Sequence, residues 1–100
     1  MNPNIDALRV QLNAETAKAD WSELLPFFAK GQLLHVDSTL DLIEVAAHIA
    51  ADHAPSVQTW LTTGRLSKLD NATAQDWQER SPPIWTVVVA PWILVQERLH

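Results

Sequence analysis

The chain has 100 residues, which is enough for one hydrophobic core and too few for two. Apolar residues make up 47% of it and charged residues 19%, a balance typical of globular domains and unlike that of disordered chains. The formal net charge of -5 opposes non-specific attachment to nucleic acid or anionic lipid, because both depend on Lys and Arg.

Cysteine is absent, so neither a disulfide framework nor a thiolate metal site is available. The first six residues carry no positive cluster and lead into no apolar core, which is not the form of a secretory signal. The longest apolar run, residues 84–95, is interrupted by Thr86 and Pro91 and is shorter than the ~20 residues that cross a bilayer. We therefore expect a cytoplasmic protein with no membrane role and one domain over residues 1–100.

The chain opens with an amphipathic helix. Ile5, Leu8 and Leu12 recur at helical spacing, and the helix ends near Asn13 or continues through the Ala-rich stretch to Lys18.

A second helix is expected between Asp20 and Gly31. Asp20 is followed three residues later by Glu23, which resembles a capping box with Asp in place of Ser or Thr. Gly31 is positioned to end this helix in a left-handed conformation.

Residues 41–64 predict two helices joined at Ala54-Pro55, in the outline of a helix-turn-helix. Their buried stripes are formed by Leu42, Val45, Ala46 and Ile49 in the first helix and by Val57, Trp60 and Leu61 in the second. Gly64 closes the pair. Short strands are expected on either side, at residues 33–36 and 65–69.

Asp70 can cap a further helix that must end before Ser81-Pro82-Pro83. The β-branched and aromatic residues at 84–90 predict a central strand. Pro91 cannot donate to a ladder, so the sheet must bend, bulge or expose an edge there. A tight hairpin is not expected, because no glycine-containing pair sits at this joint. Residues 92–97 fit a strand or a helix.

Together these elements predict an α+β fold, mostly helical, with four to five helices. Its small sheet would come from residues 33–36, 65–69 and 84–95, with the helix-turn-helix-like pair at 41–64.

Nothing in the sequence indicates an enzyme or a cofactor. Only Gly31 and Gly64 are glycines, and both suit helix ends, so a phosphate-cradling loop is excluded. No serine is flanked by glycines in the pattern of a nucleophile elbow.

Glu44, His48 and Asp52 lie four residues apart and would project from one strip of a helix. Carboxylate and imidazole are acceptable ligands for zinc, manganese or iron, so this strip is a candidate metal site. The alternative is an ordinary solvated helix side.

Five tryptophans are many for this length, and large aromatics serve both core packing and binding hot spots. Trp92, next to Pro91, is the candidate for a partly exposed anchor. A strand edge opened at Pro91 would recruit another strand, which predicts contact with a protein partner or a second copy.

The helix pair also resembles excisionase-like helix-turn-helix modules. The matching positions are Val45-Ala46, Ile49, Val57, Trp60-Leu61 and Gly64-Arg65-Leu66. The spacing from Ile49 to Val57 is one residue longer than in those modules, and the turn lacks their glycine. The resemblance implies DNA contacts within residues 55–68, from Ser56, Gln58, Thr59, Thr62, Arg65 and Lys68. The net acidity opposes this role.

A resemblance over most of the chain is to a family of short bacterial proteins of unknown function. It rests on residues 15–18 (ETAK), 21–24 (WSEL), 27–31 (FFAKG), 42–46 (LIEVA), 58–61 (QTWL), 76–77 (DW) and 88–97 (VVAPWILVQE). Pro26 departs from the family's usual helix. The resemblance implies a free-standing cytosolic protein and no particular chemistry. The leading hypothesis is a non-enzymatic protein-interaction or self-association module, with DNA binding and metal binding as alternatives.

Overall fold

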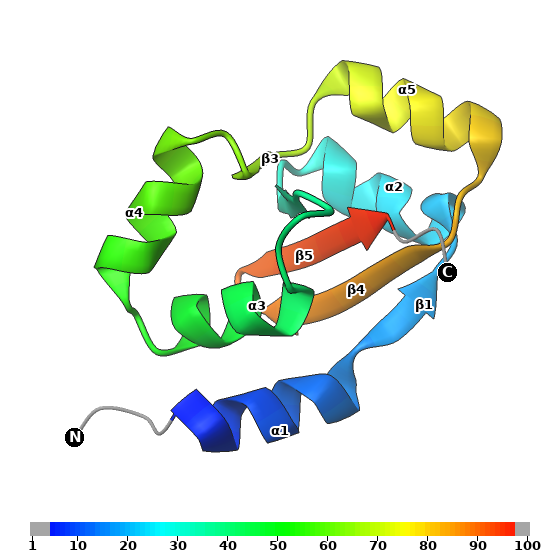
Figure 1. Ribbon diagram of the computed structural model, residues 1–100. Helices are drawn as coiled ribbons and strands as arrows, with labels where there is room; N and C mark the ends of the chain where they lie inside the picture. The colour runs from blue at the N-terminus through cyan, green and yellow to red at the C-terminus, as the bar shows by residue number, and fades with distance from the viewer. Residues whose placement is uncertain (1–4, 98–100) are drawn as a thin grey trace.

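A computed structural model describes residues 5–97 and shows an α+β fold in which helices flank a five-stranded sheet (Figure 1). The helices are α1 (Ile5–Glu15), α2 (Trp21–Ala29), α3 (Leu42–Ala50), α4 (Ala54–Thr62) and α5 (Asn71–Arg80). The strands are β1 (Ala17–Ala19), β2 (Leu33–Val36), β3 (Leu66–Lys68), β4 (Ile84–Val89) and β5 (Trp92–Glu97). Residues 1–4, in which the sequence predicts no secretory signal, and residues 98–100 lie outside the described part.

The sheet has the order β1-β4-β5-β2-β3. All neighbouring strands are antiparallel except β5 and β2, which run parallel. The predicted α+β class, the strands at 33–36 and 65–69 and the helix pair at 41–64 are confirmed. Residues 92–97 form a strand.

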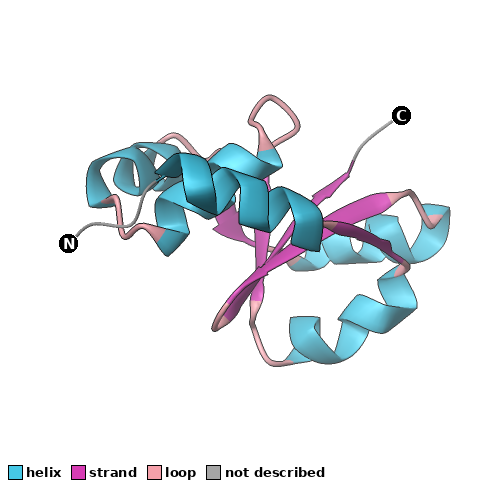
Figure 2. Cartoon of the chain, turned by 90° about the horizontal axis from the view of Figure 1, so that it is seen from below, coloured by secondary structure: helices cyan, strands magenta, loops and turns pink. Residues whose placement is uncertain are grey.

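Each face of the sheet packs against its own set of helices (Figure 2). One core lies under α1, α3 and α4 and is made of Leu12, Leu34, Val36, Leu42, Val45, Ala46, Ala47, Leu66, Val87 and Leu94. The other lies under α2 and α5 and is made of Trp21, Leu24, Leu33, Leu69, Ala74, Trp77, Ile84 and Val95. Within residues 5–97, no helix is long and apolar enough to span a bilayer.

The expectation that no tight hairpin forms at this joint, because it lacks a glycine-containing pair, was wrong. β4 and β5 pair in register from Ile84 opposite Glu97 to Val89 opposite Trp92, and the connection is Ala90-Pro91, whose peptide bond is cis. Two-residue connections are not confined to glycine-containing turns, since some turn types contain proline. Both strands are central in the sheet order, but β1 pairs only with residues 84–86 of β4, so within residues 5–97 the part of β4 next to the turn has no ladder partner on that side. The edges of the sheet are β1 and β3.

The Ala-rich stretch after α1 forms an edge strand and not a helical extension. The helix ends at Glu15, and Ala17 pairs with Thr86 while Lys18 pairs with Trp85. The Thr86 hydroxyl donates to the Ala17 backbone oxygen at 3.1 Å. Alanine favours helices locally, but ladder hydrogen bonds with a distant strand override that preference.

Three helices begin after an aspartate, and the aspartates act differently. Asp41 accepts hydrogen bonds from the backbone N–H groups of Ile43 and Glu44, and Asp70 accepts one from Thr73. Asp20 makes no side-chain cap hydrogen bond, so the predicted capping box before α2 was wrong. The N–H of Glu23 donates instead to the backbone oxygen of Asp20 at 3.0 Å.

We expect Asp41→Ala and Asp70→Ala each to lower the free energy of unfolding by about 1 kcal/mol, because each leaves helix N–H groups without their acceptor. Asp20→Ala is the matched control and is expected to change it little. Urea unfolding followed by circular dichroism measures all three. Equal losses of unfolding free energy in Asp20→Ala and Asp41→Ala would contradict a stabilising role for the Asp41 side-chain cap.

Candidate binding cleft

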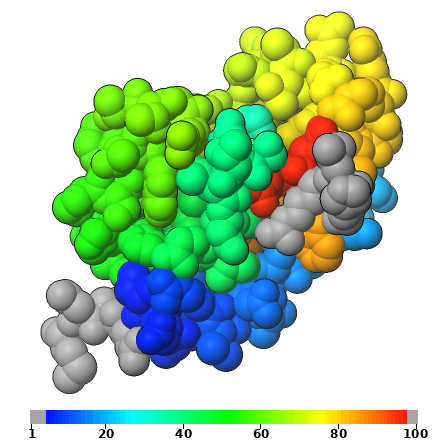
Figure 3. All heavy atoms as spheres, in the orientation of Figure 1, coloured from blue at the N-terminus to red at the C-terminus, as the bar shows by residue number. Residues whose placement is uncertain are grey.

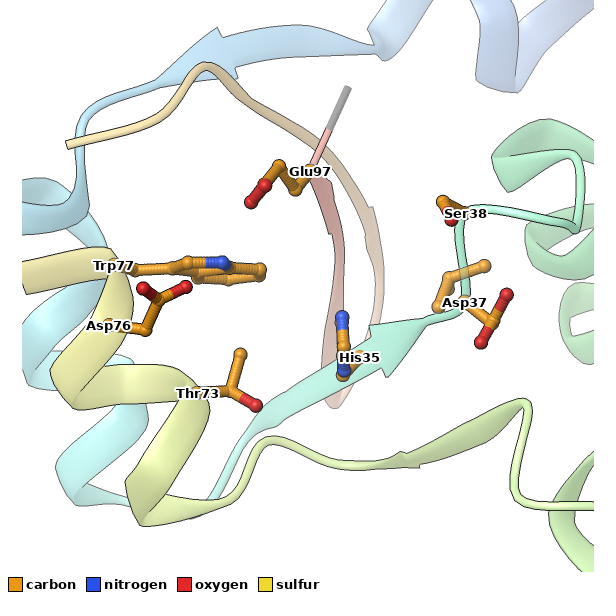
Figure 4. Close-up of a pocket in the computed structure, with 8 residues that line it drawn as sticks. His35, Asp37, Ser38, Thr73, Asp76, Trp77 and Glu97 are labelled. Carbon is orange, nitrogen blue, oxygen red and sulfur yellow. The ribbon is translucent and has the colours of Figure 1, made fainter. Parts of the chain in front are cut away.

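A cleft lies beneath α5 where the parallel strands β2 and β5 end (Figure 4). Its volume is about 320 Å³. The lining residues come from β2 and the turn after it, from α5 and from the end of β5: His35, Val36, Asp37, Ser38, Thr73, Asp76, Trp77 and Glu97. The end of β5 reaches the molecular surface between the segment after β2 and α5 (Figure 3). Ligands of open α/β sheets bind outside the carboxyl ends of strands, so this position favours a binding site.

The turn after β2 is held by a buried side chain of β5. Gln96 is 2% exposed, and its Nε2 donates to the backbone oxygens of Asp37 at 2.9 Å and Leu40 at 2.7 Å. The Asp37 carboxylate accepts hydrogen bonds from the N–H and the hydroxyl of Thr39 at 2.8 and 2.7 Å. These bonds hold the pKa of Asp37 below its usual range, and the charge of Arg65 adds a smaller contribution. Asp37 is therefore ionised at neutral pH.

The opposite wall of the cleft is α5. Figure 4 shows Thr73 and Trp77 projecting from this helix toward His35. Trp77 is 2% exposed, and its ring meets the His35 ring edge to face with 5.4 Å between centroids. A second edge-to-face contact, 6.0 Å from Trp21, fixes Trp77 against α2. The aromatic side of the cleft is therefore rigid.

Arg80 joins two of the carboxylates in the cleft lining. Its guanidinium donates to Asp76 at 2.6 and 2.7 Å and to Glu97 at 2.6 and 3.0 Å. The hydrogen bonds and charge of Arg80 lower the pKa of Asp76, and the two carboxylates raise the pKa of Arg80. The Arg80 side chain is 47% exposed, so the pairing is screened by solvent and adds little to stability.

His35 is half-buried between the two walls. Burial lowers its pKa, because the imidazolium loses its hydration; the negative charges of Asp70, Asp37 and Glu97 oppose this less strongly. The imidazole is therefore neutral at pH 7.

The residues for which the sequence predicts protein contact lie at the other end of β5. Pro91 is exposed in the hairpin turn. Trp92 is half-buried, packs against the core under α3, and carries the Lys68 ammonium 5.7 Å from its ring centroid. Part of the Trp92 ring is therefore already in contact with other residues of the same chain.

The residues predicted to contact DNA run from α4 to β3: Ser56, Gln58, Thr59, Thr62, Arg65 and Lys68. Ser56 is half-buried and the other five are exposed. Some of their polar groups bond within the helix, since Gln58 donates to Thr62 at 3.3 Å and the Thr59 hydroxyl donates to the Pro55 backbone oxygen at 3.0 Å. The terminal strand does not cover this face.

Glu44, His48 and Asp52 do not come together as metal ligands. The Glu44 carboxylate accepts hydrogen bonds from Arg9 at 2.7 and 2.8 Å, and His48 Nδ1 donates to the Glu44 backbone oxygen at 2.8 Å. Asp52 lies beyond the end of α3 with a φ of 57°, so the helical spacing assumed for it does not hold. In the described part of the chain, no three His, Asp or Glu side chains are grouped to hold a metal ion.

Sequence reasoning assigned His35 to a strand and Trp77 to a helix but neither to a site. One available signal was the histidine inside the apolar run Leu33 to Val36. Another was the polar group of residues 37–39 directly after that strand. Neither signal shows that α5 and the end of β5 lie nearby.

The observations define a small α+β domain with a mixed sheet and an acidic cleft at the end of its parallel strand pair. The chain belongs to the family described as protein of unknown function (DUF2288), whose model matches residues 7–97. It is similar to PA1075 from Pseudomonas aeruginosa, known from an NMR solution structure. The two are 50% identical with a TM-score of 0.82, over 94% of this chain and 87% of that one. No curated protein matches the chain. The predicted family is confirmed, whereas the excisionase-like resemblance stays a prediction.

We expect His35 to make the protein less stable as the pH falls below about 6.5, the ordinary pKa of histidine. The unfolded chain takes up the proton more readily than the folded chain, so stability is full above that pH and is lost as the pH falls toward the lowered pKa. His35→Gln should reduce the dependence of the free energy of unfolding on pH in this range. Chemical unfolding on either side of pH 6.5 measures it, with His53→Gln, an exposed histidine, as the control. Parallel curves for wild type and His35→Gln would contradict the expected shift.

Proposed function

We propose that this protein is a non-enzymatic interaction module that self-associates through the end of the β4–β5 hairpin. The contact surface, called the hairpin surface below, consists of Phe27, Val88, Pro91, Trp92 and Ile93. It includes the two residues for which the sequence predicts protein contact. Val88 and Ile93 lie on the sheet face covered by α2, and Phe27 is on α2 itself, whereas Trp92 lies on the opposite face, so the surface wraps around the end of the hairpin.

The exposure of Val88 carries the proposal. Ile84 lies on the same strand and the same face and is completely buried, whereas Val88 is 58% exposed. The covering helices therefore stop short of the hairpin turn. An exposed apolar side chain on a central strand suggests a surface that a partner covers.

Phe27 extends this apolar area from α2. The N–H of Gln32 donates to the Phe27 backbone oxygen at 3.0 Å, and the N–H of Ile93 donates to the Gln32 oxygen at 2.9 Å. These bonds place the end of α2 beside the start of β5, where Ile93 pairs with Val88. Phe27 is 36% exposed. Full burial of one such side chain stabilises an association by roughly 1.5–3 kcal/mol.

We expect Val88→Asp to weaken self-association about tenfold or more, because it places a charge in an apolar contact. Val10→Asp is the matched control, since Val10 is 74% exposed on α1, away from the hairpin surface. Sedimentation velocity over a concentration series should show assembly in wild type and Val10→Asp and monomers in Val88→Asp. Monomers throughout the wild-type series, or equal behaviour of the two variants, would reject the proposal.

DNA binding is the second candidate, favoured by the exposed polar side of α4. The side chains of Gln58, Thr59 and Thr62 would contact base edges, and Arg65 would contact a backbone phosphate. Lys68 contributes less, because its ammonium lies over Trp92. The net charge of -5 also opposes approach to DNA.

If this second role holds, a random-sequence duplex should bind at low salt, and Arg65→Ala should weaken binding and reduce its salt dependence. Fluorescence anisotropy during a salt titration measures both effects. Arg80→Ala is a control, because that arginine is on α5 and outside residues 55–68. Absence of binding at low salt would remove DNA from consideration.

A further inference from the structure

We infer that two copies of the chain join edge to edge through β4, with residues 87–89 of one copy paired antiparallel to the same residues of the other. A twofold axis at Val88 relates the copies and makes their sheets continuous. This pairing rests on the self-association proposed above and specifies how the two backbones meet. It can therefore fail while association through the hairpin surface stands.

Strand β4 is longer than the strand that pairs with its outer side. It has 6 residues, whereas β1 has 3 and reaches only from Ile84 to Thr86 (Figure 1). The helix before β1, α1, packs through Leu8 and Leu12 into the core under α3, so it lies against one face of the sheet. Within residues 5–97, the outer side of residues 87–89 has no ladder partner.

The backbone N–H and C=O of Val88 point toward this open side. Val88 lies opposite Ile93 in the β4–β5 ladder, and the N–H of Ile93 donates to the Gln32 backbone oxygen on the far side of β5 at 2.9 Å. Residues directly opposite in an antiparallel pair exchange both backbone hydrogen bonds or neither. Val88 therefore does not bond to β5, and its backbone groups are directed to the outer edge of β4.

Residues 87–89 lack the features that protect the edges of this sheet. The edge strands β1 and β3 carry Lys18 and Lys68, and a lysine on an edge strand discourages pairing with another chain. The open part of β4 consists of three valines, which favour extended backbone and carry no charge. This segment is therefore the part of the sheet best suited to accept a further strand.

Charge and symmetry select a second copy as that partner. Residues 84–96 contain no charged side chain, although the chain has a formal net charge of -5. Two copies can therefore meet here without placing like charges in contact, whereas a strongly charged partner would find no opposite charge. A twofold axis at Val88 lets the two Val88 residues exchange both backbone hydrogen bonds, with their Cα atoms about 5.5 Å apart.

The same pairing covers the exposed apolar side chains. Residues directly opposite in an antiparallel ladder point to the same face, so the two Val88 side chains lie side by side on the face covered by α2. Ile93 lies beside Val88 on that face. The contact therefore forms a row of Ile93 and Val88 followed by the same two residues of the second copy. Val88, which is 58% exposed in one copy, becomes covered.

Val88→Pro separates backbone pairing from side-chain contact. Proline keeps an apolar side chain but has no N–H to donate, and the Val88 N–H makes no bond to β5. We expect Val88→Pro to weaken dimerisation about tenfold or more in sedimentation velocity. Val88→Ile is the matched control, because it keeps the N–H and a β-branched apolar side chain, and it should dimerise like the wild type. The NMR spectrum of each variant reports whether it is folded.

A second measurement uses the wild type and does not depend on the folding of a variant. Antiparallel pairing about Val88 places Val87 opposite Val89 of the second copy, with Cα atoms about 4.5 Å apart. An isotope-filtered NOE experiment on an equal mixture of ¹³C-labelled and unlabelled protein should therefore show an intermolecular contact between the Hα atoms of Val87 and Val89.

The intermolecular contact together with the loss of dimerisation in Val88→Pro supports edge pairing. Dimers without this contact, or a folded Val88→Pro that dimerises as tightly as the wild type, would overturn it and leave association through side chains of the hairpin surface. If Val88→Pro does not fold, the intermolecular contact alone decides. A wild type that stays monomeric rejects both edge pairing and the self-association on which it rests.

Discussion

Strand β5 is buried on both faces of the sheet, and the rest of the fold is arranged around that constraint. Leu94 and Val95 point to opposite faces, and both are completely buried. A strand buried in this way needs helices on each face and a paired neighbour on each edge. β4 supplies one edge through a short hairpin, and β2 supplies the other by running parallel. This arrangement also brings the ends of β2 and β5 together, which creates the cleft.

The elements that could be predicted are those specified by local pattern. The apolar stripe and the aspartate cap of α3 lie within one stretch of chain, so periodicity was sufficient to identify the helix. The β1 strand could not be found in this way, because residues 17–19 are Ala-Lys-Ala and favour a helix locally. Only pairing with β4, far away in the sequence, makes them extended. Likewise, residues 92–97 were ambiguous until the register with β2 and β4 was known.

The cleft could not be predicted from local sequence patterns for the same reason. His35, Trp77 and Glu97 come from three separated segments and meet only because β2 and β5 are adjacent in the sheet. The metal prediction relied on helical spacing from Glu44 to Asp52, and this spacing does not hold because α3 ends at Ala50. Local spacing thus places residues on an element, but a site depends on how elements pair.

The cleft and the hairpin surface lie at opposite ends of β5, and this separation has a consequence for how they act on each other. A strand of 6 residues spans roughly 20 Å at about 3.3 Å per residue, which exceeds a Debye length of about 8 Å at physiological salt. Charge added in the cleft is therefore largely screened at the hairpin surface. A second copy covering the hairpin surface leaves the carboxyl ends of the strands open. Any coupling between the sites would have to pass through the packing of β5 itself, whose buried side chains allow little movement.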